Sequence, residues 1–195
     1  MGREMSVDRR EFVSALVRAS PHALFIAGLG SPAWDLFAAG DRDENFYLWG
    51  AMGGAAAMGL GLALAQPSRS VIVVTGDGEQ LMGMGSLATI AVQKPPNLTI
   101  VVLDNGRYGE TGMQRSHTDA VTDLAGVAKC CGISDSVSID RIGDAQRVAR
   151  RAASRTGPAV FVVKVDVTEA PRALPPRDGA YLKTRFRARL GLAPL

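Results

Sequence analysis

The chain has 195 residues, of which 47% are hydrophobic, and a formal net charge of +3 at pH 7. This length and apolar content suit one domain with a proper core. The charge is mild, and no basic patch with interleaved aromatic residues precedes the C-terminal segment, so nucleic-acid binding is not expected. The longest apolar run, about residues 51–65, is too short and too glycine-rich to cross a bilayer. No membrane partner is expected either.

The only two cysteines, Cys130 and Cys131, are adjacent. They lack the CxxC spacing of a metal site, and they form no disulfide framework. The sequence also carries no pattern typical of a signal peptide. We therefore expect a cytoplasmic protein in a reducing setting.

The N-terminal segment predicts a helix over 6–19, because its apolar residues form one stripe and Ser6 or Asp8 can serve as the N-cap. A short apolar strand over 23–27 follows. A glycine-rich turn then leads into a helix that begins near Pro32, and such a helix start can face an anion. A plain strand-to-helix turn is the alternative interpretation.

The centre of the chain has the pattern of a βαβ unit. An Ala/Gly-rich helix over 53–65 precedes it, and two apolar runs rich in β-branched residues, 71–75 and 98–103, enclose a helical segment. Parallel strands end at the same edge of a sheet, where ligands of open α/β sheets usually bind. Asp77 and Asn105, which follow the two runs, are therefore expected side by side at that edge.

The remaining chain continues the alternation of helices and strands. Helices are predicted over 123–131 and 144–153, and a last buried strand over 160–165. We predict an α/β fold with a doubly wound, largely parallel sheet and helices on both faces. This domain is expected to cover 1–170. The segment 171–195 is Pro-rich and then basic, and is interpreted as a solvated helix or subunit-docking arm, with binding of an acidic substrate or a membrane as the alternative.

The two polar residues at the strand ends indicate a specific chemistry. Asp77 and Asn105 offer the oxygen ligands that suit Mg²⁺, which usually also takes phosphate oxygens and water. Gly76 and Gly78 allow the backbone to approach a ligand closely, and the amides that open the following helix point at an anion. The pattern therefore predicts a diphosphate held through Mg²⁺.

This constellation, Gly-Asp-Gly, helix, second strand and Asp104-Asn105, resembles the diphosphate-binding signature of thiamine diphosphate enzymes. The resemblance implies that Asp77 and Asn105 bind Mg²⁺ through their side chains and Arg107 through its backbone carbonyl. The family usually has Asn-Asn where this chain has Asp104-Asn105. We expect Asp104 to lie beside the ligands rather than to bind the metal.

A second match to the same family covers residues 46–64. It implies that Gly50 contributes a backbone carbonyl to the aminopyrimidine and that Met52 is the apolar wedge beneath the cofactor; ordinary core packing is the alternative for Met52. The full set of cofactor-binding residues implied by the resemblance is Gly30, Ser31, Gly50, Met52, Gly76, Gly78, Glu79, Tyr108 and Gly109.

The glycine-rich loop over 108–114 ends in Gly-x-Gln and is similar to that of the sulfopyruvate and phosphonopyruvate decarboxylases. This likeness implies possible substrate contacts from Glu110, Gln114 and His117. Arg115 is a further candidate, because it can pair with a substrate carboxylate or sulfonate. A surface histidine and a solvated arginine are the alternatives.

In the family, a glutamate of a separate pyrimidine-binding domain activates the cofactor. No glutamate of this chain lies in a second α/β unit; they are Glu4, Glu11, Glu44, Glu79, Glu110 and Glu169. The resemblance therefore implies a two-chain enzyme, most simply α2β2, in which a pyrimidine-binding α subunit supplies the catalytic glutamate. This chain resembles the β subunits of sulfopyruvate decarboxylases and the C-terminal domain of phosphonopyruvate decarboxylases.

The implied activity is that of a lyase: non-oxidative decarboxylation of a small 2-oxoacid, releasing CO2 and an aldehyde. Thiamine diphosphate and Mg²⁺ are the implied cofactors. Two alternatives remain open at this point. The chain could belong to a thiamine diphosphate-dependent carboligase that makes an acyloin or an acetolactate-like product, or it could be a non-catalytic cofactor-binding module.

Overall fold

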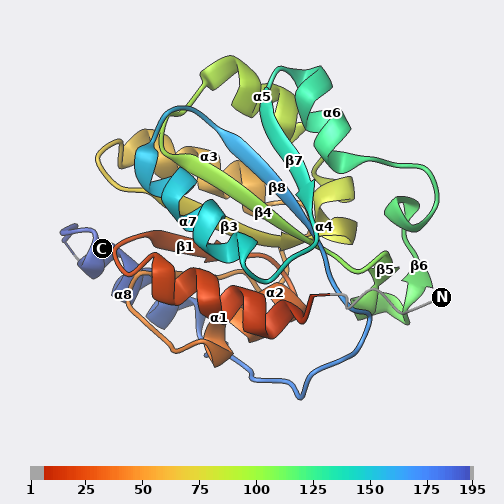
Figure 1. Ribbon diagram of the computed structural model, residues 1–195. Helices are drawn as coiled ribbons and strands as arrows, with labels where there is room; N and C mark the ends of the chain where they lie inside the picture. The colour runs from red at the N-terminus through yellow and green to blue at the C-terminus, as the bar shows by residue number, and fades with distance from the viewer. Residues whose placement is uncertain (1–6, 194–195) are drawn as a thin grey trace.

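The computed structural model describes residues 7–193. A six-stranded sheet forms the centre, in the order β2-β1-β3-β4-β8-β7, and all of its strand pairs are parallel (Figure 1). The prediction of a doubly wound parallel sheet is thereby confirmed. The strands are β1 (Leu24–Ala27), β2 (Asn45–Tyr47), β3 (Val71–Gly76), β4 (Leu98–Asp104), β7 (Asp135–Ile139) and β8 (Ala159–Lys164).

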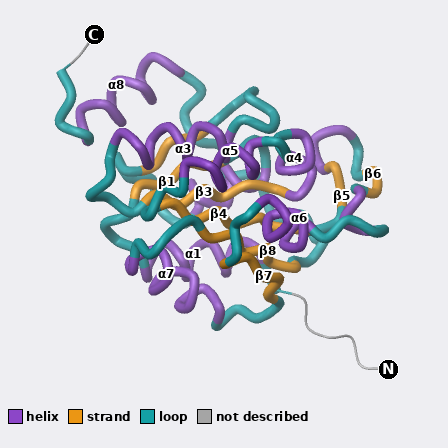
Figure 2. Tube along the Cα trace, turned by 90° about the horizontal axis from the view of Figure 1, so that it is seen from above, coloured by secondary structure: helices purple, strands orange, loops and turns teal. Residues whose placement is uncertain are grey.

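Helices cover both faces of the sheet, as the view from above shows (Figure 2). One face carries α1 (Arg9–Ala19), α2 (Ser31–Ala38) and α7 (Asp144–Ser154), and the other carries α3 (Ala55–Ala65), α5 (Ser86–Gln93) and α6 (Leu124–Cys131). The short α4 (Asp77–Met82) begins directly at the end of β3. No helix within 7–193 has both the length and the apolar character to cross a membrane.

The central strands are apolar throughout because both of their faces are buried. Successive side chains point to opposite faces. In β3, Ile72 and Val74 therefore join the core beneath α1, α2 and α7, whereas Val71 and Val73 join the core beneath α3, α5 and α6. This two-sided burial explains why the sequence signal was strongest for β3 and β4.

The strand order places a topological switch point between β1 and β3. From β1 the chain runs outward through α2 to the edge strand β2, and then returns through α3 to β3 on the other side of β1. Ligands of open α/β sheets bind in the crevice at such a point, outside the carboxyl ends of the strands. The turn after β1 and the residues after β3 and β4 therefore border one crevice.

Some elements differ from their predicted extents. The N-terminal helix begins at Arg9, and Asp8 is its N-cap because its carboxylate accepts the N–H of Glu11; Ser6 lies outside the described residues. The predicted central helix is divided into α4 and α5 by 83–85, a Gly-Met-Gly segment. The strands β2 and β7 were not predicted, since one has three residues and the other is largely polar.

The C-terminal segment folds back along the sheet edge. The last helix, α8 (Gly179–Arg189), packs beside β2 (Figure 1). Arg185 forms an ion pair with Asp41, and the ring of Phe186 meets that of Phe46 edge to face. Arg189 also pairs with a residue of its own chain, Glu44.

Candidate cofactor site

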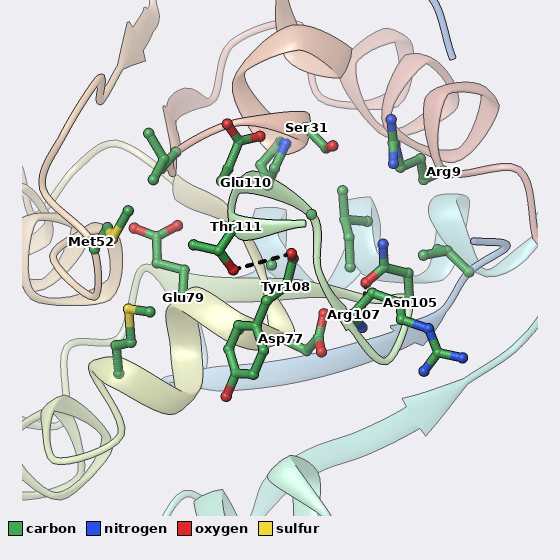
Figure 3. Close-up of a pocket in the computed structure, with 18 residues that line it drawn as sticks. Arg9, Ser31, Met52, Asp77, Glu79, Asn105, Arg107, Tyr108, Glu110 and Thr111 are labelled. Atoms are coloured by element: carbon green, nitrogen blue, oxygen red, sulfur yellow. Dashed lines mark hydrogen bonds between the residues drawn. The ribbon is translucent and has the colours of Figure 1, made fainter. Parts of the chain in front are cut away.

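A pocket lies at the carboxyl ends of the central strands, where the switch point predicts one (Figure 3). We call it the strand-end pocket. Asp77, Asn105 and Arg107 lie toward one end of it, whereas Met52 and Glu79 lie toward the other. Its lining residues are Arg9, Leu29, Ser31, Pro32, Met52, Gly76, Asp77, Gly78, Glu79, Met82, Leu103, Asn105, Arg107, Tyr108, Gly109, Glu110, Thr111 and Val165.

Asp77 is the most deeply placed acidic group of the pocket, with 1% of its surface exposed. Burial raises the pKa of its carboxyl, hydrogen bonds from Ser116 and Thr118 lower it, and the nearby charge of Asp104 raises it. Both hydroxyls contact the same oxygen, Oδ2. Within the described chain no side chain donates to Oδ1, so this oxygen is available to a cation that would also offset the cost of the buried charge.

Asn105 and Arg107 follow β4 and can complete such a cation site. The side-chain oxygen of Asn105 accepts the N–H of Arg107 at 2.9 Å, which leaves its second lone pair free. Arg107 pairs with Arg115 across a small antiparallel hairpin, and the preceding carbonyl, of Gly106, accepts the N–H of Ser116. Because carbonyl directions alternate in such a pair, the Arg107 carbonyl points away from the partner strand. The donor set of carboxylate, amide and carbonyl oxygens fits Mg²⁺.

The turn after β1 offers hydrogen-bond donors to an anion. Gly30 has φ +73°, a conformation that favours glycine, and no side chain caps the first N–H groups of α2, which begins at Ser31. Glu110, from the loop opposite, reaches over this turn (Figure 3). Its Oε1 lies 2.3 Å from where a Cβ on Gly30 would be, so a larger residue at this position would displace the glutamate.

Glu79 turns toward the far end of the pocket, and its carboxylate lies close to Gly28 at the end of β1 (Figure 3). Its Oε2 accepts the hydroxyl of Thr75 at 2.7 Å, and a Cβ on Gly28 would lie only 1.7 Å from the same atom. Burial raises the pKa of the Glu79 carboxyl, while Thr75 and nearby backbone N–H groups, including that of Ala55, lower it. Among the described residues, Thr75 makes the one hydrogen bond that this carboxylate accepts, and Oε1 is buried without a partner. A buried acceptor that lacks a donor in this way is free to bind a donor of a ligand in the pocket.

Met52 does not belong to either hydrophobic core. Half of its surface is exposed, and its side chain borders the pocket near that of Met82. A Cβ on Gly50 would have no neighbour within 4 Å, so the backbone there is open to a ligand. These features fit an apolar platform for a flat ring system, next to a backbone that can accept hydrogen bonds.

Comparison with known proteins identifies the family. Residues 37–163 match the family model described as thiamine pyrophosphate enzyme, C-terminal TPP binding domain. The chain belongs to this family. The predicted cofactor, thiamine diphosphate (the same compound as thiamine pyrophosphate), is thereby confirmed, and the matched region contains Met52, Asp77 and Asn105.

The most similar proteins include decarboxylases. The chain is 38% identical over 160 residues to sulfopyruvate decarboxylase subunit beta of Methanococcus maripaludis, covering 82% of this chain and 85% of that subunit. It is 41% identical over 146 residues to phosphonopyruvate decarboxylase of Streptomyces hygroscopicus, covering 75% of this chain but 36% of that protein.

Solved structures of similar fold include benzoylformate decarboxylase from Polynucleobacter necessarius. The TM-score is 0.71 at 21% identity, and the match covers 88% of this chain and 36% of that one. The TPP binding domain described here therefore spans about a third of that structure's length. At this identity the likeness supports the fold alone.

The loop that closes the pocket of this TPP binding domain is a hairpin of β5 (Arg107–Tyr108) and β6 (Gln114–Arg115). One short 3-10 turn, Gly109–Thr111, joins the two strands, and another, His117–Asp119, follows β6. Tyr108 packs on Gly78, where a Cβ would lie 2.6 Å from its ring, and its hydroxyl lies 3.0 Å from Nδ1 of His117. Glu110 lines the pocket, but Gln114 and His117 do not. Gln114 bonds within the loop to Thr111.

Two groups near the cofactor site were not found from the sequence. Arg9 lines the pocket from α1 and pairs with the fully buried Asp35. Ser116 and Thr118 contact Asp77 across about forty residues. No local sequence pattern indicates the pairing of Arg9 with Asp35. The Ser-x-Thr spacing directly after the glycine-rich loop is a weak indication of the contacts with Asp77, since hydroxyls in alternate positions can share one acceptor.

Proposed function

We propose that this chain is the diphosphate- and Mg²⁺-binding subunit of a two-chain thiamine diphosphate-dependent 2-oxoacid decarboxylase of the sulfopyruvate or phosphonopyruvate decarboxylase kind. The reaction would be non-oxidative and release CO2 and an aldehyde. The observation that carries this proposal is the match to 85% of a sulfopyruvate decarboxylase beta subunit, combined with a pocket whose donor set fits the cofactor's diphosphate and metal.

The chain's own residues would bind the cofactor and its metal and orient them in the pocket. Asp77, Asn105 and the carbonyl of Arg107 would hold Mg²⁺, and the free N–H groups near Gly30 and Ser31 would face the diphosphate. When bound, thiamine diphosphate supplies the electron sink that permits loss of CO2. The remaining implied contacts, from Gly50, Met52, Gly76, Gly78, Glu79, Tyr108 and Gly109, belong to the same proposal.

A partner subunit is the second part of the proposal. Met52 and Met82 leave about half of their surfaces exposed beside the pocket, and a second chain would cover them. In this proposal a pyrimidine-binding α subunit supplies the catalytic glutamate, in an α2β2 assembly. The free thiols Cys130 and Cys131 are consistent with a reducing compartment, so we place the assembly in the cytoplasm.

Substrate would enter beside the hairpin loop. Glu110 already borders the pocket, and a modest movement of the loop would bring Gln114 and His117 toward it. Arg115 pairs with Asp119, so it would have to exchange this partner to bind a substrate anion.

The TPP-binding unit is proposed to comprise 1–170, with 171–195 as an arm; residues 1–6 and 194–195 lie outside the described range.

Reconstitution tests the proposal. The chain is mixed with a candidate pyrimidine-domain subunit, thiamine diphosphate and Mg²⁺, and CO2 release is measured with sulfopyruvate and phosphonopyruvate, with and without an acceptor aldehyde. We expect CO2 and free aldehyde from the mixture and neither from the separate chains. A ligated product in place of the aldehyde would assign the chain to a carboligase. Cofactor binding without turnover of any 2-oxoacid would leave it a non-catalytic module.

A further inference from the structure

Two hydroxyls, one on the buried Ser116 and one on the partly buried Thr118, connect the segment after the hairpin to the proposed metal ligand. Ser116, with 2% of its surface exposed, donates from its Oγ to Oδ2 of Asp77. The Oγ1 of Thr118 lies 3.1 Å from the same oxygen, 2.8 Å from the Ser116 hydroxyl and 2.7 Å from Oδ1 of Asp104. One threonine hydroxyl thus lies between two buried carboxylates.

Counting protons assigns the bonds in this cluster. Each hydroxyl has a single proton to donate. Ser116 gives its proton to Asp77, and Thr118 shares its proton between Oδ1 of Asp104 at 2.7 Å and Oδ2 of Asp77 at 3.1 Å. Thr118 thereby bridges the two carboxylates and limits how far that of Asp77 can rotate.

Asp104 is held in place by other donors and makes a fixed anchor. Its Oδ1 also accepts the N–H of Gly106 at 3.0 Å, and its Oδ2 forms an ion pair with the ammonium of Lys164 on the neighbouring strand β8. Only 3% of its surface is exposed. Both oxygens of Asp104 are therefore engaged, whereas Asp77 is held at Oδ2 and keeps Oδ1 without a side-chain donor.

We propose that Ser116 and Thr118 are positioning residues that hold Asp77 with Oδ1 directed at the metal, anchored through Asp104 and Lys164. This inference rests on the proposed metal site and adds a device to it: the loop carrying Ser116 and Thr118 sets the orientation of the metal ligand. Groups that orient a ligand in this way typically change metal affinity by about 10- to 100-fold when they are removed.

The test is a titration of Mn²⁺, followed by electron paramagnetic resonance, into the full chain with saturating thiamine diphosphate, alone and with the partner subunit. Thr118→Val and Ser116→Ala remove the hydroxyls at nearly constant shape. We expect each to weaken Mn²⁺ binding by about 10-fold or more. Thr118→Ser, which keeps the hydroxyl, is expected to restore nearly all of the affinity.

Thr156→Val is the matched control. Thr156 is exposed and precedes β8 at the opposite end of the sheet, so its replacement is expected to leave Mn²⁺ affinity unchanged. A merely structural role for Thr118 would lower the thermal unfolding midpoint without changing metal affinity in the folded variant. If Thr118→Val does not fold, the same titration of Ser116→Ala, which removes only the hydroxyl oxygen, tests the positioning role.

Wild-type affinity for Mn²⁺ in both hydroxyl-deleted variants would overturn the inference. Absence of Mn²⁺ binding by the wild-type assembly would overturn it together with the metal site. Because the titration measures binding alone, an assembly that shows the expected affinities but releases no CO2 would contradict the proposed function and support the positioning role.

Discussion

At the scale of single residues, the candidate cofactor site contains a carboxyl whose charged form is disfavoured by burial. Asp77 is almost fully buried, and within the described chain its side-chain hydrogen bonds come from hydroxyls rather than from a cation. Burial raises the pKa of its carboxyl. The metal-free protein therefore carries a cost at Asp77 that cation binding would offset.

Replacing Asp77 by Asn should separate stability from function. The native carboxyl keeps its proton to higher pH than the unfolded one, so the stability of the metal-free wild type falls as pH rises from about 4 through the raised pKa. Asp77→Asn does not lose stability in this pH range, because its amide does not ionise. We expect it to raise the free energy of unfolding at neutral pH by about 0.5–2 kcal/mol and to abolish Mg²⁺ binding. Urea unfolding at several pH values measures the first effect, and a destabilised variant with wild-type pH dependence would contradict it.

At the scale of elements, α3 contains two glycines in contrasting surroundings. A Cβ at Gly59 would lie 2.2 Å from the side chain of Val73 on β3, whereas one at Gly61 meets nothing within 4 Å. Close packing of helix on sheet therefore requires glycine at one position only. Gly61→Ala should stabilise the chain by about 0.5–1 kcal/mol by favouring the helix. Gly59→Ala should destabilise it by about 1–3 kcal/mol through overpacking. Thermal unfolding of the two variants measures both changes. Equal changes in stability at Gly59 and Gly61 would contradict this explanation.

The packing of α1 on α2 depends on a buried ion pair. Asp35 on α2 is fully buried and accepts the Nε of Arg9 at 2.7 Å and that of Arg10 at 3.0 Å. Asp35→Asn would leave the buried guanidinium of Arg9 without its counter-charge. We expect a loss of about 3 kcal/mol or more in the free energy of unfolding, measured in urea. Asp140→Asn, at an exposed site with a 3.9 Å ion pair, is the control and should change it by less than about 0.5 kcal/mol.

At the scale of the whole molecule, the sequence predicted the structure best for strands that are buried on both faces, because their apolar pattern is continuous along the chain. The runs that became β3 and β4 are apolar throughout, and they predicted both the sheet and the positions of Asp77 and Asn105 at its edge. The edge strands β2 and β7 were missed because short or half-polar segments carry little periodic signal. Contacts such as that of Arg9 with Asp35 depend on how distant segments meet, which no local pattern records.

In the proposed function, Asp77 and its neighbours hold thiamine diphosphate through Mg²⁺. The most direct test of this proposal is calorimetric titration of thiamine diphosphate into this chain, alone and with the partner subunit, with and without Mg²⁺. We expect binding that requires Mg²⁺, tightens with the partner, disappears in Asp77→Ala and persists in Asp140→Ala. Binding that ignores both Mg²⁺ and the loss of Asp77, or no binding in any mixture, would contradict the account.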